Sequence, residues 1–372
     1  MDILLSLPVV SYFFSTSLTS WSTSLNLLFF YMTWSTLVLT HSPLHIEILG
    51  ITALRIVLWL FPSLIFLAFD ALVPSLAQSI KYNGASALPP RDAKSLAKLT
   101  GLALFNLALE TALEAGISLG LAALLKTPVF RTSTTLPLPW QMMKHIALLL
   151  TGREILTYYT HRYLLHGHPA PAITLTKSHK PKLSRTTKPA PPARSLTALH
   201  TRHAHARAAP PFALALKTDH PLPYLLHRFL PLYLPALALR SHLHLLTFLL
   251  FAALATLEET VTLSGYTAVP GILLGGMARR AAVHYRGAGR GGRGGGGGGG
   301  GKVGNFGGWG VLDWVHGTSL GGDVMADLRD EADKHRVQER GARKVGEVGD
   351  AVRDGVEGWR KGNGKRKGKK GE

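Results

Sequence analysis

The sequence contains no cysteine among its 372 residues. A chain without thiols forms no disulfide, no thiolate nucleophile, no cysteine-ligated zinc site and no iron–sulfur cluster. Any metal that it binds must therefore be held by histidine and carboxylate ligands.

Charged residues are also scarce, at 17% of the chain, whereas 46% of the residues are hydrophobic. Typical soluble domains carry about 25% charged residues. The basic excess, 41 Lys and Arg against 22 Asp and Glu, is concentrated toward the C-terminal half. This pattern favours a membrane protein with a basic cytosolic side over a nucleic-acid-binding protein.

Long apolar segments predict several membrane-spanning helices. They comprise residues 3–40, 47–80 with a break near Pro62, 99–127, 140–166, and 222–275 as two helices or a re-entrant pair. Asp2 is the only early charge, so the first segment is typical of a membrane anchor rather than of a signal peptide. We expect about four to six membrane segments in an all-α, polytopic bundle.

The loops predict how these helices are oriented. Residues 81–98 form a basic loop that we expect on the cytosolic side, with Lys81, Arg91, Lys94 and Lys98. The segments 99–127 and 140–166 are joined by a short turn and so form a hairpin. The basic loop and the histidines at the end of the second segment therefore share the cytosolic face.

One apolar segment carries a polar stripe. Asn106, Glu110 and Glu114 are spaced four residues apart and so lie on one face of the helix. Acidic groups at membrane depth usually face the interior of a bundle. We expect these side chains to form hydrogen bonds between helices rather than to act in catalysis.

Composition divides the chain into three parts. Residues 1–98 contain the N-terminal membrane segments and the basic loop, residues 99–328 form a membrane domain that contains the candidate metal-ligating histidines, and residues 329–372 form a charged, basic tail that we expect to be disordered. Two flexible inserts interrupt the middle part: the Pro- and Lys-rich residues 169–195 and the Gly-rich residues 287–301.

Histidines gather at the ends of the apolar segments. The candidate metal ligands are His161, His166, His200, His203, His205, His220 and His284. Histidine is the commonest nitrogen ligand of transition metals. Several histidine pairs lie beside segments apolar enough to cross a membrane. This arrangement favours a metal site over a set of solvated histidines.

The spacing of the pairs constrains how they can meet. His200 and His203 are separated by about 60° on a helix, so both can reach one metal. His205 joins them only if the helix ends there. His161 and His166 are separated by about 140° on an ideal helix and converge only where it bends or stops.

A cysteine-free histidine site at a membrane surface allows zinc-dependent hydrolysis or iron–oxygen chemistry. Zinc peptidases usually carry H-E-x-x-H, which this sequence lacks. Iron is therefore the favoured metal.

Several motifs together resemble the fatty acid hydroxylase/sterol desaturase superfamily, over roughly residues 140–320. The matching elements, in order, are Glu154, Tyr158, His161 and His166; His200 and His203; His220–Pro221; Ser264–Gly265–Tyr266; Asn305–Phe306–Gly307; and Asp313 with Gly317–Thr318. The local sequences around these motifs are most similar to those of filamentous-fungal sterol-desaturase-like membrane proteins.

The chain departs from the family pattern at three places. Ala204 stands where the second box has its third histidine, and His205 would replace it by a slip of one residue. Leu263 precedes Ser-Gly where many members have histidine. The third box is reduced to His284.

The resemblance implies a membrane-bound, non-haem di-iron oxidoreductase of the endoplasmic reticulum with a cytosolic histidine lobe. Such an enzyme uses O2 to hydroxylate or desaturate a sterol or long-chain lipid, with electrons from a cytochrome b5-type donor. Glu154 would be a partner that orients a ligand histidine.

Two other classes of function remain open. A catalytically lapsed homologue would bind a lipid or a protein partner, which the reduced third box favours, and metal analysis distinguishes it from the oxidase. A metal-ion transporter would place its histidines in an unstructured loop, whereas here they adjoin helix ends.

Overall fold

The computed structural model describes residues 21–167, 192–205, 212–269, 272–291, 303–321 and Arg329. Within these ranges the regular elements are helices, and the only extended pairings are the isolated bridges Lys81–Tyr266 and Arg131–His244. The described part of the chain is thus helical, as the sequence predicts.

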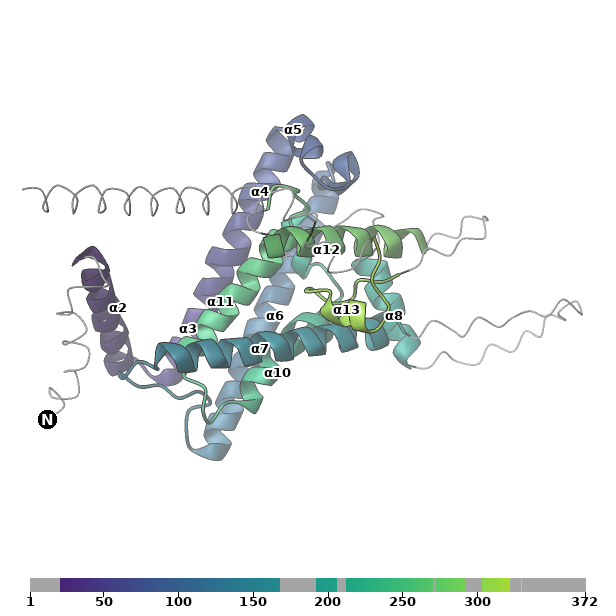
Figure 1. Ribbon diagram of the computed structural model, residues 1–372. Helices are drawn as coiled ribbons and strands as arrows, with labels where there is room; N and C mark the ends of the chain where they lie inside the picture. Colours follow the sequence, from purple (N-terminus) through teal and green to yellow (C-terminus); the bar gives the residue numbers. More distant parts are fainter. Residues whose placement is uncertain are drawn as a thin grey trace, which may run out of the picture.

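Figure 1 shows long helices that lean against one another and a group of shorter elements at one side. The α-helices are α2 (Trp21–Thr40), α3 (Pro43–Arg55), α4 (Phe61–Leu72), α5 (Pro74–Ser79), α6 (Ala93–Leu125), α7 (Pro139–Tyr159), α8 (Pro192–His203), α9 (Pro221–Tyr224), α10 (Leu230–Ala238), α11 (Leu245–Thr262), α12 (Ile272–Gly291) and α13 (Val311–Val315). Three π-helical turns continue α3, α7 and α9, at Ile56–Leu60, Thr160–Leu165 and Leu225–Phe229. Two 3-10 turns lie at Gly84–Ala87 and Ala213–Lys217.

Three helices are long and apolar enough to cross a membrane. They are Pro43–Leu72, which joins α3 to α4 through the first π turn, Ala93–Leu125 and Leu245–Thr262. In their most apolar windows only 22%, 17% and 44% of the residues are buried inside the protein. Because most of these apolar residues are not buried inside the protein, they suit a lipid environment. The described residues therefore indicate a membrane protein.

The break expected near Pro62 is the π turn Ile56–Leu60, which continues the helix instead of interrupting it. Since proline lacks an N–H and crowds the preceding turn, a local change of winding lets the helix pass it. The expected total of four to six membrane segments stays a prediction, because residues 1–20 lie outside the described residues.

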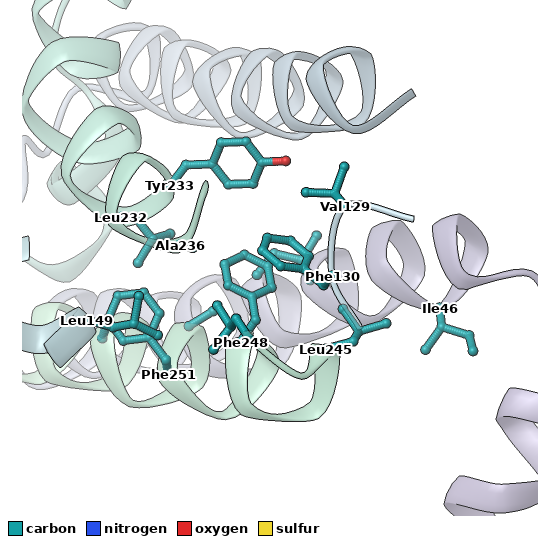
Figure 2. Packing of buried hydrophobic residues seen from close by; sticks show 14 of the residues in the cluster. Ile46, Val129, Phe130, Leu149, Leu232, Tyr233, Ala236, Leu245, Phe248 and Phe251 are labelled. Carbon is teal, nitrogen blue, oxygen red and sulfur yellow. The ribbon is translucent and has the colours of Figure 1, made fainter. Parts of the chain in front are cut away.

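The largest hydrophobic cluster joins α3, α7, α10, α11 and the segment before α7 (Figure 2). The ring of Phe130 stacks on that of Phe248, with the centroids 4.4 Å apart, and meets Tyr233 edge-on. Leu149 of α7 and Phe251 of α11 are fully buried beside them. This packing fixes the first half of α7 against α10 and α11.

The hairpin predicted from residues 99–127 and 140–166 differs from the observed packing. α7 packs mainly on α10 and α11, whereas α6 packs mainly on α3 and on the turn Ala213–Lys217. In Figure 1 α7 runs obliquely across α6. The hydrophobic cluster explains this, because it draws the first half of α7 toward the later helices of the chain.

The polar stripe of α6 forms hydrogen bonds between elements, as expected. Glu110 forms an ion pair with Arg55 (2.8 Å) and accepts hydrogen bonds from Lys217 (2.6 Å) and from the hydroxyl of Tyr224. Glu114 binds the same guanidinium of Arg55 at 2.7 Å. The opposite charges satisfy one another in the interior, where an isolated charge would be costly.

The expectation of a basic loop at residues 81–98 needs correction. α6 begins at Ala93, capped by the Asp92 side chain, so Lys94 and Lys98 lie on a helix. Lys81 is buried and pairs with Asp70.

The two inserts are shorter than predicted. α12 continues to Gly291 and thus includes the first glycines of the predicted insert. α8 begins at Pro192, since proline is well tolerated in the first helical turn. The remainder of both inserts and the tail beyond Arg329 lie outside the described residues.

Candidate metal centre

The first histidine pair is brought together by a change of helical winding. His161 and His166 lie at the π turn that follows α7, and the His166 amide donates to the His161 carbonyl at 3.0 Å. An i to i+5 hydrogen bond places residue i+5 above residue i, on the same face. Their Nε2 atoms lie 3.2 Å apart. The bend that the sequence requires is thus a π turn.

The second pair consists of His200 and His205. α8 ends at His203, and the chain turns back through a hydrogen bond from the Ala204 amide to the His200 carbonyl at 2.8 Å. His205 can therefore approach His200, which the sequence predicts only if the helix ends here. The Nε2 atoms of His200 and His205 lie 3.1 Å apart.

Two further histidines complete the group. His284 of α12 lies with its ring centroid 4.6 Å from that of His161. His227, in the π turn Leu225–Phe229, lies 4.2 Å from the same ring. Sequence reasoning missed His227, because it stands alone within an apolar segment and belongs to no histidine box.

Six imidazoles from four parts of the chain thus meet, and five of them are buried. We call this set the histidine cluster: His161, His166, His200, His205, His227 and His284. In four of them, His161, His166, His205 and His284, one ring nitrogen each lies within 4.8 Å of the others. Two nitrogens bound to one metal at about 2.1 Å are themselves separated by roughly 3 Å, which matches the two observed pairs.

Hydrogen bonds fix the orientation of three rings. The Nδ1 of His161 donates to the Phe306 carbonyl at 2.9 Å, and that of His284 to the Gly304 carbonyl at 2.7 Å. The Nδ1 of His200 lies 2.6 Å from a carboxylate oxygen of Asp219. A proton on Nδ1 leaves the Nε2 lone pair free, which is the tautomer that a metal ligand needs.

Burial favours the neutral form of five rings in the histidine cluster. It lowers the pKa of His161, His166, His205 and His227 well below the usual 6.5, and neighbouring imidazoles lower it further. Burial likewise lowers the pKa of His284 to about 4. Neutral imidazoles bind a metal without first releasing a proton.

Two buried ring nitrogens have no hydrogen-bond partner, the Nε2 of His284 and the Nδ1 of His205. A buried nitrogen without a partner is uncommon and costs free energy. A metal ion would satisfy the lone pair on His284.

The loop Val303–Gly321 supplies the carbonyls that orient two of the rings. Asp313 holds it by accepting hydrogen bonds from the amides of Phe306 (2.9 Å) and Gly307 (2.8 Å) and from the Thr318 hydroxyl (2.7 Å). The D-x-x-x-G-T motif therefore shapes the loop and does not itself reach the cluster.

Asn305 ties the same loop to α12. Its backbone has a positive φ of 56°, which asparagine tolerates better than most residues. The side-chain amide donates to the carbonyls of Arg280 and Leu320, and its oxygen accepts from the Leu320 amide at 2.9 Å.

Glu154 acts on the loop rather than on a ring. Its carboxylate accepts hydrogen bonds from the amides of Gly308 (3.2 Å) and Trp309 (2.9 Å). A Cβ at Gly307 would lie 2.6 Å from a carboxylate oxygen of Glu154, so only glycine allows this approach. The predicted role of Glu154 is therefore indirect: it holds the loop whose carbonyls orient the histidines.

The structure places His203 and His220 beside each other, outside the histidine cluster. Their ring centroids lie 5.3 Å apart. The Nδ1 of His203 bonds the Leu199 carbonyl at 2.9 Å, and that of His220 accepts from the Leu222 amide and caps α9. Because α8 ends at His203, His205 takes the place beside His200 that the helical spacing predicts for His203.

A cavity of about 70 Å³ adjoins the cluster. His161, His227 and His284 line one side. The other side carries ion pairs between Arg153 and Glu258 (3.0 Å) and between Arg153 and Glu259 (2.9 Å). The cavity has room for a few water-sized molecules next to the imidazoles.

No protein-family model and no solved structure matches this chain. The arguments for function therefore depend on the site itself and on the sequence motifs.

Proposed function

We propose that the protein is a membrane-bound, non-haem di-iron oxidoreductase that uses O2 to hydroxylate or desaturate a sterol or long-chain lipid. One observation carries the proposal: six imidazoles from distant parts of the chain meet, and in three of them a hydrogen bond at Nδ1 leaves Nε2 as the nitrogen that can bind a metal.

The donor set fits iron. It contains nitrogen ligands without thiolates, and imidazole suits iron, zinc, copper and nickel. The histidine cluster would hold the metal, and its two pairs with Nε2 atoms 3.2 and 3.1 Å apart offer positions for two ions. When bound, iron would supply the reduction of O2 that oxidises an unactivated C–H bond.

The stoichiometry of the reaction shows that electrons and protons are needed besides O2. Hydroxylation of one C–H bond by O2 consumes two electrons and two protons and yields one hydroxyl group and one water. Desaturation takes two hydrogens from the lipid, consumes the same electrons and protons, and yields two waters. A cytochrome b5-type protein is proposed as the electron donor, by family resemblance.

Residues of this chain would keep the site rigid and close to lipid. Asp219 and the carbonyls of Gly304 and Phe306 prevent the rings from turning. The three membrane-length helices would place the cluster at the edge of a bilayer, which we propose to be that of the endoplasmic reticulum with the cluster on the cytosolic side.

The test combines metal analysis with lipid analysis. The full chain, purified in detergent from an iron-replete eukaryotic host, should contain about two irons per chain. Host lipids should gain hydroxylated or desaturated species that vanish in a His200→Ala/His205→Ala variant. The matched control is His203→Ala/His220→Ala, which should keep both.

Three results discriminate between the candidate functions. Zinc in place of iron, with unchanged lipids, would contradict the oxidase. Chains without metal would favour the lapsed lipid- or partner-binding homologue. Uptake of metal ions that depends on His200 and His205 would favour the transporter.

A further inference from the structure

Helix α7 is built with its polar residues inside and its apolar residues outside, over its second half. Arg153, Glu154 and Tyr158 are buried. Ile155 and Tyr159 on the opposite side are 42% and 39% exposed. A helix on the surface of a water-soluble protein shows the reverse pattern.

The exposed stripe extends along the whole helix. Trp140 is 73% exposed, Met143 63% and Leu148 49%. Lys144 is the only charged residue among the exposed positions of α7. It lies one turn from Trp140, where its long side chain can reach a headgroup region.

The short helix α13 adds to the same face. It packs on α7, and the Tyr159 hydroxyl lies 3.1 Å from the Nε2 of His316 directly after α13. Val311, Trp314 and Val315 of α13 are 46%, 55% and 62% exposed. We call the exposed residues of both helices the α7–α13 face: Trp140, Met143, Leu148, Ile155, Tyr159, Val311, Trp314 and Val315.

We propose that lipid covers the α7–α13 face, with Trp140 at one headgroup region and Tyr159 and Trp314 at the other. α7 would then be an oblique fourth lipid-facing helix, beside the three that are apolar enough to cross. The sequence also predicts a membrane segment at residues 140–166, although the buried polar residues that serve the metal centre and its loop lower the hydropathy of α7.

Two observations favour lipid over a protein partner. The face is continuous with a membrane-length helix, since α7 packs on α11. Aromatic residues occupy its two ends, and Trp and Tyr prefer membrane interfaces.

The placement has a consequence for the metal centre. His161 lies two residues beyond Tyr159, on the buried side of the same continuous helix. The histidine cluster would then lie at headgroup level, beneath α13. A lipid could reach it without leaving the bilayer, whichever reaction the metal performs.

The absence of cysteine makes a direct test possible. Single cysteines are introduced in the full chain at Gln141, Leu148, Ile155 and Val315, labelled with a nitroxide and reconstituted in phosphatidylcholine–phosphatidylserine vesicles. Collisions with O2, which concentrates in lipid, and with a water-soluble nickel complex then report the depth of each label. Leu64→Cys in α4 and Arg202→Cys on α8 provide the membrane and water controls.

The expected profile is deepest at Leu148 and shallower toward both ends. Collision with nickel at Leu148→Cys should be about tenfold lower than at Arg202→Cys, because a charged complex is excluded from hydrocarbon. Val315→Cys should report headgroup depth.

Three outcomes would overturn the proposal. High nickel collision at every position would mean that water covers the face. Protection from both reagents would mean that a protein or a second copy covers it. Equal, shallow depth from Gln141 to Ile155 would mean that α7 lies flat on the membrane. Since none of the four positions belongs to the histidine cluster, iron binding measured on the same samples tests the proposed function separately.

Discussion

Two clusters of buried polar side chains lie close together in this protein and are built on opposite rules. In the first, centred on Glu110, carboxylates face Arg55 and Lys217, so that each charge meets its opposite. In the second, the histidine cluster, like groups face one another, and Nε2 atoms approach to 3.1 and 3.2 Å. The first cluster satisfies its own charges, whereas the second gathers neutral rings, of which His284 has a buried Nε2 without a partner that an added cation could bind.

The two clusters are also connected. Asn106 of α6 donates to the carbonyls of Lys217 (2.7 Å) and Asp219 (2.8 Å). Lys217 binds Glu110, and Asp219 binds His200. The membrane helix α6 thus fixes the short segment that orients a ring of the histidine cluster. Substitutions in each cluster can separate structural support from metal binding.

The largest expected effect follows from removal of a central ring. His161→Ala takes away the ring that packs on those of His166, His200, His227 and His284. We expect the metal affinity to fall more than about 100-fold, beyond the loss typical of an outer partner. Metal content after dialysis against a graded chelator measures this, and near-normal retention would mean that the ring is not a ligand.

Glu110→Ala should act on folding instead. It leaves Lys217 and Arg55 in the interior with one fewer counter-charge, which costs about 3–5 kcal/mol of unfolding free energy. Unfolding in detergent monitored by circular dichroism reports the change. The double variant Glu110→Ala/Lys217→Met should recover part of the loss, and a double variant no more stable than Glu110→Ala would refute the account of charge matching.

Asp219→Asn tests the link between the clusters. The amide keeps the shape of the side chain but removes the charge that supports the proton on His200 Nδ1. A loss of metal affinity of about 10- to 100-fold is expected, with little change in unfolding. His220→Ala is the matched control, because it changes the neighbouring side chain in the same segment but keeps Asp219 and the backbone amide that donates to it. Equal losses in both variants would assign the effect to the loop.

His203→Ala should have the smallest effect. Its ring lies against His220, and its Nδ1 is bound to a carbonyl of its own helix. Metal affinity should change less than about twofold, as for surface changes away from a site. A loss similar to that of His161→Ala would show that the pair joins the cluster when metal is bound.

The two clusters also differ in how far their side-chain contacts could be predicted from the sequence. The stripe Asn106, Glu110 and Glu114 predicted hydrogen bonds between helices correctly, because an α-helix with regular winding needs only the spacing. The histidine pairs depend on irregular winding. A π turn at Thr160–Leu165 arises from packing, so the sequence showed that a bend was needed but not its form.

Whether His203 or His205 lies beside His200 depends on where helix α8 ends. α8 ends at His203, and this brings His205 to His200 and leaves His203 outside. Helix ends are poorly fixed by local sequence. His227 carried no signal at all, since a single histidine in an apolar segment looks like an ordinary buried residue.

The measurement that tests the central claim most directly is the metal content of the full chain, together with its X-ray absorption spectrum. The account predicts tightly bound iron with a first shell of nitrogen and oxygen at about 2.1 Å, lost from His161→Ala and kept in His203→Ala. Protein that folds stably, contains no metal after expression in iron-replete cells and takes up none on titration would contradict it.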